Sequence, residues 1–406
     1  MVKLKKLFGN SSHTLKANIW TQVSGVFIML TIPNILSIDD YAKVIYFTFL
    51  LSFTPIYDLG LVAVYNRLIP GLIGKENQKV NEIESTLVRY LIFMSVLFSS
   101  VISFVYYYKY SSVIESCLIF IYLPISLIVS FLIVRDVVRE DYLPYYKNIR
   151  FQSIIKLLQI PLTFAFSIIG WFISSLITQI ALFIKVFNQG IFKNKYNFAF
   201  IKANLKEGIE LSVKTFVWLQ VLNFPRTYAS LNYSNELIAQ YGLVNSMYQV
   251  IVSLSLAIFI PVTIKTFKLF AKSDRLAFYY LKKVLNKTMP LFLVGSILLI
   301  LIVPEVIKIL FPKYNIPFEM IFGYFGTVGL LPMFFIVGII FTGIKHNNQS
   351  IAISLVVLSL IYVCIFNDIF NLNYGYFILV AIITLMSYLY ILKWRKNENR
   401  ISRRRI

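Results

Sequence analysis

The sequence predicts an all-α membrane protein with about twelve transmembrane helices in two six-helix bundles. Of its 406 residues, 58% are hydrophobic and only 14% are charged, and the mean hydropathy is +0.74. Soluble domains of this size do not have such a composition. The apolar residues gather into twelve stretches, most of them close to the roughly 20 residues that a helix needs to cross a bilayer. Lys and Arg residues fall almost entirely on one side of these stretches.

Six spans are expected in the first half of the chain. In order, they are 14–36, 41–63, 86–108, 113–134, 149–169 and 172–187. The first span is interpreted as an uncleaved helix, because no short apolar core with a small-residue cleavage site follows the basic N-terminus. A turn at Gly170 separates the last two spans. Pro55 lies inside the second span, where a proline kinks a helix: it either shapes the bundle or lets the helix bend between states.

Six further spans are expected in the second half, at 207–229, 237–262, 286–310, 316–343, 347–367 and 372–393. A polar connection from about Asn188 to Lys206 lies between the two sets. We therefore predict one bundle over residues 1–195, a second over 196–393 and a basic cytoplasmic tail over 394–406. An even number of helices in each half implies parallel repeats related by an axis along the membrane normal.

Both termini are expected to be cytoplasmic, because cytoplasmic loops retain positive charge. Most of the 39 basic residues lie in the termini and the even-numbered loops: Lys3 to Lys16, Arg67 to Arg89, Arg135 to Arg150, Lys185 to Lys206, Lys265 to Lys287, Lys345, and Lys393 to Arg405. The exceptions are Lys43, Lys109, Arg226, Lys308 and Lys313 on the opposite side, and Lys156 and Lys214 inside spans. The net charge of +21 is therefore explained by loops that face anionic membrane lipids, and nucleic-acid binding is not expected.

The motifs of enzymes are missing from the sequence. It has no glycine-rich phosphate loop, no recognisable nucleophile motif and only two histidines, His13 and His346. Cys117 and Cys364 lie in or beside apolar stretches and indicate neither a disulfide framework nor a metal site. We therefore expect neither an enzyme nor a cofactor or metal.

Five charged residues lie at depths where a charge costs about 2.5–3.5 kcal/mol. They are Asp58, Lys156, Glu210, Lys214 and Arg226. Glu210 and Lys214 have the i,i+4 spacing of a local ion pair, and Lys156 could instead extend toward the headgroups. Asp58 could bind a proton or a cation, or it could be a structural acid that accepts backbone hydrogen bonds; both interpretations are open at this point.

Amide side chains form stripes along three of the predicted helices. The stripes are Asn18, Gln22 and Gly25; Gln220, Asn223 and Arg226; and Asn245, Gln249 and Ser253. Such faces are expected to point toward protein or water rather than lipid, although hydrogen bonds between helices could also account for the amides. We predict a water-filled, basic cavity between the two bundles, which would attract an anion such as a diphosphate.

Several short segments resemble a known transporter family. They are Ile32-Pro-Asn-Ile-Leu-Ser-Ile-Asp-Asp-Tyr-Ala-Lys-Val-Ile-Tyr-Phe, Asp58-Leu-Gly-Leu, Gln240-Tyr-Gly-Leu and Leu310-Phe-Pro-Lys-Tyr. The chain is similar to the bacterial polysaccharide transporters that translocate lipid-linked O-antigen units, within the superfamily that also holds multidrug-exporting antiporters and lipid II flippases. It departs from the pattern at Pro225, where relatives often carry an acidic residue, and at Phe311, which replaces a glycine.

The resemblance implies a MATE-like fold and a flippase of the bacterial inner membrane. Such a protein moves an undecaprenyl-diphosphate-linked oligosaccharide to the outer leaflet by alternating access, for O-antigen or capsule assembly. From depth and spacing, we expect Arg226, Lys214 and Lys156 to bind the diphosphate and Asn18, Gln22, Asn223 and Gln249 to contact sugar hydroxyls. Asp58 is the candidate for ion coupling. A polysaccharide polymerase and a chain-length regulator are further candidate partners.

Two alternatives remain. A membrane-embedded O-antigen polymerase would be equally basic and aromatic, but it should carry a large outer loop, and the loops expected on that side are short. A cation-coupled exporter of small molecules with the same fold should have an acidic cavity, whereas the deep charges here are mostly basic.

Overall fold

The structure is a computed structural model that describes residues 2–139, 141–187, 192, 194–270, 273–343, 357 and 376–385. Every regular element within these residues is a helix, which confirms the all-α fold class. The predicted span at 347–367, most of the one at 372–393 and the basic tail at 394–406 lie outside the described residues. Residues Tyr376–Leu385 of the last span form a short apolar helix.

Six helices within the described residues are long and apolar enough to cross a membrane, or seven if one bent pair counts as a span. The six are Asn77–Tyr110, Val113–Val138, Gln159–Val186, Asn235–Leu256, Arg275–Leu310 and Phe318–Ile340. The chain is thus a multi-pass membrane protein. The helices that contain the predicted first and seventh spans are too polar to qualify by composition alone, which is expected of helices that face protein or water.

The chain divides into two compact units, Met1–Phe216 and Val217–Ile406. The first unit contains α1 (Val2–Ile35), α2 (Ile38–Leu51), η1 (Thr54–Ile56), α3 (Leu61–Leu68), η2 (Ile69–Gly71), α4 (Asn77–Tyr110), α5 (Val113–Val138), α6 (Tyr142–Lys156), α7 (Gln159–Val186) and the first part of α8 (Phe198–Asn232). The bundle boundary between residues 195 and 196, drawn from the polar connection, stays a prediction.

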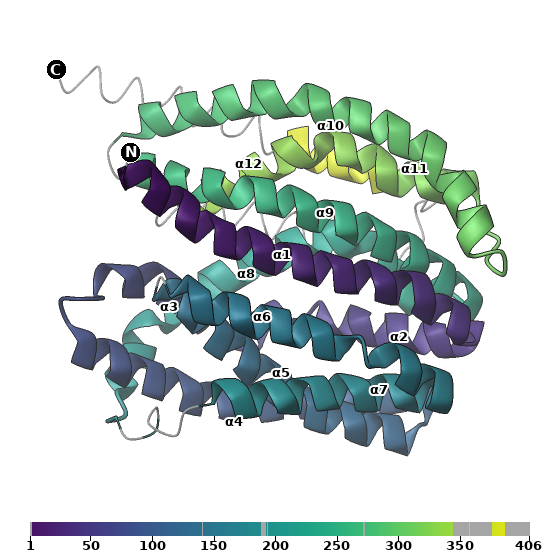
Figure 1. The fold of residues 1–406 in the computed structure, drawn as a ribbon, viewed down its shortest axis with the longest axis horizontal. Helices are drawn as coiled ribbons and strands as arrows, with labels where there is room; N and C mark the ends of the chain where they lie inside the picture. The colour runs from purple at the N-terminus through teal and green to yellow at the C-terminus, as the bar shows by residue number, and fades with distance from the viewer. Residues whose placement is uncertain are drawn as a thin grey trace. The chain divides into compact units, whose positions relative to one another are not determined.

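The core of the first unit lies between α3, α4 and α5. Helix α4 packs along α5, α5 packs against α7, and α1 packs against α6 (Figure 1). Leu61, Tyr65, Leu87 and Phe131 are among the buried residues of one apolar cluster. The rings of Tyr65 and Phe131 meet edge to face with centroids 5.3 Å apart, a favourable aromatic geometry.

The predicted second span, 41–63, is not one helix. It ends at Leu51, continues through the 3-10 turn η1 and restarts as α3, with a bend of 57° between Ile38–Ile56 and Leu61–Leu68. Leu59 and Gly60 both adopt positive φ, 50° and 73°, which ends the first segment and redirects the chain. Pro55 lies in η1 rather than kinking a continuous helix.

The turn between the predicted fifth and sixth spans lies a few residues earlier than expected. Helix α6 ends at Lys156, α7 begins at Gln159, and the sharp bend lies at Phe166 and Ser167, where Ser167 has a φ of 51°. Gly170, which we expected at the turn, has another role. A Cβ atom at Gly170 would lie 1.9 Å from the carbonyl oxygen of Leu162, so the two arms beside the bend are in backbone contact there.

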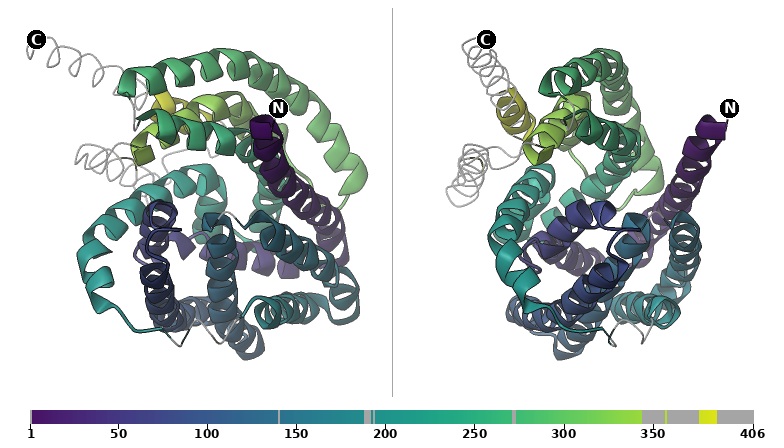
Figure 2. Two further views of the ribbon diagram at one scale, coloured as in Figure 1. Left: turned by 60° about the vertical axis from the view of Figure 1, so that its left-hand side comes forward. Right: turned by 90° about the vertical axis from the view of Figure 1, so that its left-hand side faces the viewer.

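The second unit contains the rest of α8, α9 (Asn235–Phe270), α10 (Asp274–Leu310), α11 (Phe318–Gly326), η4 (Thr327–Leu330) and α12 (Leu331–Gly343). Helix α10 packs against α9, α11, η4 and α12, and it curves along them (Figures 1 and 2). Pro290 and Pro304 lie inside α10 and account for bending, because each removes a backbone donor.

Candidate functional site

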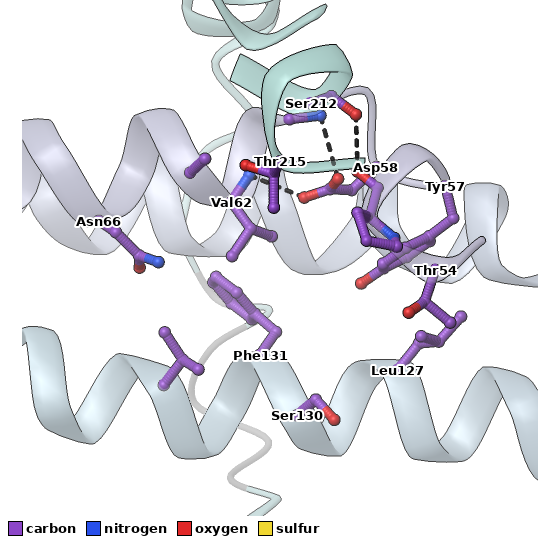
Figure 3. A pocket seen from close by; sticks show the side chains of 14 residues that line it. Thr54, Tyr57, Asp58, Val62, Asn66, Leu127, Ser130, Phe131, Ser212 and Thr215 are labelled. Atoms are coloured by element: carbon purple, nitrogen blue, oxygen red, sulfur yellow. Dashed lines mark hydrogen bonds between the residues drawn. The ribbon is translucent and has the colours of Figure 1, made fainter. Parts of the chain in front are cut away.

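A cavity of about 350 Å³ lies beside the break between α2 and α3. Three segments of the first unit form its wall: the break with the start of α3, one face of α5 and the first part of α8 (Figure 3). The lining residues are Thr54, Pro55, Tyr57, Asp58, Gly60, Val62, Ala63, Asn66, Leu127, Ser130, Phe131, Val134, Ser212 and Thr215. Asp58, the predicted ion-coupling residue, is the one carboxylate among them.

The Asp58 carboxylate lies just before α3 and accepts two backbone hydrogen bonds. Its Oδ1 accepts from the N–H of Gly60 at 3.0 Å, and its Oδ2 accepts from the N–H of Val62 at 2.9 Å. The residue is only 5% exposed. Asp58 therefore satisfies two donors at the start of a helix, as the structural interpretation expected. Each oxygen still has a lone pair left for another partner.

Close contacts with α8 hold the break in place. A Cβ atom at Gly60 would lie 1.8 Å from the carbonyl oxygen of Gly208, so only glycine allows this approach. Four residues further along α8, the Ser212 hydroxyl donates to the carbonyl oxygen of Pro55 at 2.6 Å (Figure 3). That carbonyl lies in an irregular segment without a full set of helical hydrogen bonds, so the serine satisfies a group that would otherwise need water.

A second polar cluster lies in the second unit and contains three of the predicted substrate-binding residues. The Nη2 of Arg226 donates to the Oδ1 of Asn223 at 2.9 Å, and the Nε2 of Gln249 donates to the same oxygen at 3.3 Å. Arg226 and Asn223 are on α8, whereas Gln249 is on α9. The Oδ1 atom of Asn223 thus accepts hydrogen bonds from both the guanidinium of Arg226 and the amide of Gln249.

Several buried tyrosines of the same unit were not predicted as part of a site, among them Tyr228, Tyr241, Tyr248, Tyr324 and Tyr376. Hydrogen bonds orient several of them: Tyr324 donates to the carbonyl oxygen of Tyr241 at 3.4 Å, and the hydroxyl oxygen of Tyr248 lies 3.0 Å from that of Thr327. The spacing of seven residues between Tyr241 and Tyr248 places both on one face of α9 and is the sequence signal that could have identified them.

Asn18 and Gln22 are half-buried on α1, which packs against α6. The buried positions of α1 include Ala17 and Ser24, which lie on a different face from the amides. A Cβ atom at Gly25, on the same stripe as the amides, would have no atom within 4 Å. Of the three stripe positions, Gly25 thus has room for a larger side chain, whereas Asn18 and Gln22 are partly covered.

Lys156 is the last residue of α6 and is half-buried, whereas Lys214 on α8 is buried. The predicted local pair between Glu210 and Lys214 is absent from the ion pairs of the described residues. Another acid of the same helix end, Glu207, pairs with Arg67 of α3 instead. Helix α3 approaches this part of α8 closely, so Glu207 pairs with a residue of another helix. The spacing of residues along the sequence does not reveal such a contact.

Two buried glutamates of the first unit have basic partners that sequence reasoning missed. Glu84 of α4 accepts from Arg139, at the end of α5, through both oxygens at 2.8 and 2.6 Å. Glu115 of α5 lies 3.3 Å from the Nζ of Lys43 on α2 and also accepts from the hydroxyl of Tyr106. The basic partner lies 55 residues from Glu84 and 72 residues from Glu115, far beyond the spacing of a local pair.

Comparison with known proteins identifies the fold. No family model matches the sequence, and no curated protein matches it either. Several solved structures are similar over most of their length, and three of them represent the group. They are a variant of the Vibrio cholerae MATE transporter VcmN (TM-score 0.68, 11% identity, 97% of each chain), an inward-facing multidrug resistance MATE family transporter of the MOP superfamily (0.64, 14%, 94% of this chain and 93% of that one) and the lipid II flippase MurJ in an inward closed conformation (0.63, 19%, 96% and 87%). The chain thus has the fold of MOP superfamily transporters.

Proposed function

We propose that this protein is a flippase that moves a lipid-linked oligosaccharide, carried on undecaprenyl diphosphate, across the bacterial inner membrane by alternating access. The observation that supports it best is the cluster of Arg226, Asn223 and Gln249 in a chain with this transporter fold. One of the similar structures is a lipid II flippase, whose name describes lipid-linked cargo. The use of the cargo in O-antigen or capsule assembly belongs to the same proposal.

The chemistry of the cluster suits a diphosphate joined to sugars. A guanidinium binds phosphate oxygens through two parallel N–H donors and keeps its charge at all relevant pH values. Asn223 occupies one of the donor nitrogens of Arg226 at 2.9 Å and so fixes the direction of the planar group. The amide of Gln249 donates to the same oxygen. Its remaining N–H donor and its carbonyl oxygen can form hydrogen bonds with sugar hydroxyls.

Lys214 and Lys156 are the other cations that we assign to the headgroup. Burying an ammonium without a partner costs free energy, and Lys214 is buried with no acid within ion-pair distance among the described residues. A bound anion would offset that cost. Asn18 and Gln22, the half-buried amides of α1, are assigned to sugar contacts.

A genetic test separates the proposal from its alternatives. In the bacterium that carries this gene, its deletion should leave lipid-linked oligosaccharide facing the cytoplasm, as measured by an impermeant sugar-oxidising reagent on inverted and right-side-out vesicles. Loss of a polymerase would instead leave single units facing outward. Loss of a small-molecule exporter would leave the lipid-linked pool unchanged, and either of these results would refute the flippase.

The role of Arg226 is tested by complementation of that deletion. Arg226→Ala should abolish surface polysaccharide at normal membrane levels of the protein, and Arg226→Lys should restore part of it because the charge remains while the two-donor geometry is lost. Arg275→Ala is the matched control, since Arg275 is exposed at the start of α10. Full complementation by Arg226→Ala would remove Arg226 from the binding site.

A further inference from the structure

Three basic residues of α6 and α7 lie close together without an acidic partner. They are Lys147 and Arg150 on α6 and Lys185 in the last turn of α7, and all three are exposed. Within the described residues, none of them lies within ion-pair distance of an acid. Lys43 and Arg139 of the same unit, by contrast, pair with buried glutamates. We call the three residues the α6–α7 cation cluster.

Two members of the cluster are held against neighbouring helices. The Nζ of Lys185 donates to the carbonyl oxygen of Lys147 at 3.1 Å and lies 4.2 Å from the centre of the Phe151 ring. The guanidinium of Arg150 lies 5.3 Å from the centre of the Trp20 ring on α1. A cation is attracted to an aromatic face, so these contacts fix the direction of both side chains. They bring positive charges from two helices to one stretch of α6 before any ligand binds, which lowers the cost of binding an anion there.

Exposed apolar side chains continue the face of α6 that carries the cluster. Ile154 follows Lys147 by seven residues and Arg150 by four, spacings that place all three on one face of a helix, and it is 47% exposed. On α7, an exposed apolar stripe leads to Lys185 and consists of Ile177, Ile180 and Ile184. Cations beside exposed apolar residues match the headgroup and the acyl chains of a phospholipid. A soluble acidic partner would have no use for the apolar residues.

The cluster also lies at the depth where lipid headgroups are expected. Helix α7 is long and apolar enough to cross a membrane, and it ends at Val186, directly after Lys185. Helix α6 begins at Tyr142, so Lys147 and Arg150 lie within its first nine residues. The charge pattern of the sequence predicts that this side is cytoplasmic. Basic residues between transmembrane helices at that boundary are a general way to bind acidic headgroups.

The cluster is separate from the basic residues that we assign to the cargo. Lys156 follows Lys147 by nine residues, which is two and a half helical turns, so the two residues lie on opposite faces of α6. Lys156 is half-buried, whereas Lys147 is exposed. The two cations of α6 therefore serve different surroundings.

We propose that the α6–α7 cation cluster binds the headgroup of one anionic phospholipid, whose acyl chains lie along the exposed apolar residues of α6 and α7. Arg150 supplies two parallel N–H donors for the phosphate oxygens, and the ammonium groups of Lys147 and Lys185 add charge. A general attraction of basic loops to an acidic membrane would be spread over many residues, whereas this site depends on three. It does not depend on the proposed function, because the lipid is bound without any cargo.

Native mass spectrometry of the purified full-length protein, stripped of lipid in detergent, tests the site. The probes are phosphatidylglycerol and phosphatidylcholine with identical acyl chains, titrated separately. We expect the first phosphatidylglycerol to bind at least about tenfold more tightly than the first phosphatidylcholine, because each basic residue near an acidic headgroup contributes a factor of about five. Arg150→Gln combined with Lys185→Gln should remove most of this preference.

Lys282→Gln combined with Lys283→Gln is the matched control. It removes the same charge from two exposed positions of α10 in the other unit, and it should keep the preference for phosphatidylglycerol. An equal loss of preference in the two double variants would show a general attraction to acidic lipid and would overturn the proposal. Equal binding of the two lipids by the wild type would overturn it as well.

A single variant covers the case in which the neutral double variant does not fold. Lys147→Gln removes an exposed charge but keeps the backbone carbonyl that accepts from Lys185. It should weaken the binding of phosphatidylglycerol by about fivefold and leave both the Tm and the binding of phosphatidylcholine unchanged. If its affinity for phosphatidylglycerol equals that of the wild type, Lys147 does not contact the headgroup and the proposed site is wrong.

Discussion

Gly60 and Gly208 bring the backbones of the α2–α3 break and of α8 into direct contact. A Cβ atom at Gly60 would lie 1.8 Å from the carbonyl oxygen of Gly208, and a Cβ atom at Gly208 would lie 2.6 Å from the carbonyl oxygen of Leu59. Both obstacles are backbone atoms, so no flexible side chain can move aside. This contact sets the wall of the cavity that contains Asp58, because Ser212 and Thr215 follow on the same helix.

We therefore expect Gly208→Ala to destabilise the protein. The added methyl group must push α8 away from the break, at a cost of about 1–3 kcal/mol for overpacking. The Tm of the purified protein should therefore fall. Gly60→Ala should be worse, because Gly60 also has a positive φ of 73°.

Gly295→Ala provides the control for that comparison. Gly295 lies inside α10, and a Cβ atom there would meet nothing within 4 Å. Since alanine favours a helix over glycine by about 1 kcal/mol, Gly295→Ala should leave the Tm unchanged or raise it. If Gly208→Ala and Gly295→Ala lower the Tm equally, the close backbone contact at Gly208 does not explain the destabilisation.

The apolar stretches predicted the helices of the described residues well, but they did not predict that the second span breaks into two helices. Hydropathy runs without interruption from α2 into α3, so residues 41–63 were expected to form one helix. The break depends on Asp58 capping α3 and on the fit of Gly60 against Gly208, a residue nearly 150 positions away. Contacts of that range have no periodic signature in the sequence.

The same limit applies to the sites. The polar stripes predicted that Asn223, Arg226 and Gln249 face inward, and the structure joins all three through one amide oxygen. Spacing alone also suggested a pair of Glu210 with Lys214, because i,i+4 pairs are visible in a sequence. The pairs that buried acids form join residues of different helices, as with Glu84 and Arg139, which are 55 positions apart, and only the fold reveals them.

Removal of Arg139 should be costly because it leaves Glu84 charged and buried. The side chain of Glu84 is 3% exposed and accepts two hydrogen bonds from Arg139 and one from the hydroxyl of Tyr65. We expect Arg139→Ala to lower the free energy of unfolding by about 1–3 kcal/mol, the cost of leaving a buried polar group unsatisfied. Adding Glu84→Gln should recover part of this loss, since no buried charge then remains.

Lys308→Ala is the matched control for Arg139→Ala. The pair of Lys308 with Glu305 has a similar separation, 2.8 Å, but its side chains are 71% and 66% exposed. Exposed pairs contribute about 0–1 kcal/mol, so its loss should barely change the Tm. If the double variant of Glu84 and Arg139 is less stable than Arg139→Ala alone, the unpaired charge is not the cause.

Lys43 and Tyr106 should share the task of stabilising Glu115. Lys43→Met removes the positive charge 3.3 Å from the carboxylate, and Tyr106→Phe removes the hydroxyl hydrogen bond to its other oxygen. Both partners act on the same buried group. The loss of unfolding free energy in the double variant should therefore differ from the sum of the two single losses by an interaction energy of about 0.5–3 kcal/mol. Strict additivity in this double-mutant cycle would show that the two partners act independently.

Asn223→Asp should weaken the binding of an anionic headgroup without unfolding the protein. The substitution preserves the shape of the side chain but places a negative charge 2.9 Å from the Nη2 of Arg226. The resulting pair is a charge-assisted hydrogen bond, about twice as strong as a neutral one. It offsets the lost donation from the Asn223 Nδ2 to the carbonyl oxygen of Leu219, so the Tm should not fall. The new carboxylate, however, would compete with a diphosphate for the charge of the guanidinium.

Complementation of the deletion strain distinguishes these two effects of Asn223→Asp. We expect surface polysaccharide to fall by at least about tenfold, which corresponds to about 1.4 kcal/mol of lost binding, while the amount and Tm of the purified protein stay at or above those of the wild type. Gln249→Glu carries the same added charge on α9. Because Gln249 donates to the amide oxygen of Asn223, this charge is one contact further along the cluster and should reduce the polysaccharide less. If Asn223→Asp transports normally, the charge of Arg226 is not what the cargo recognises, and Arg226 has a structural role.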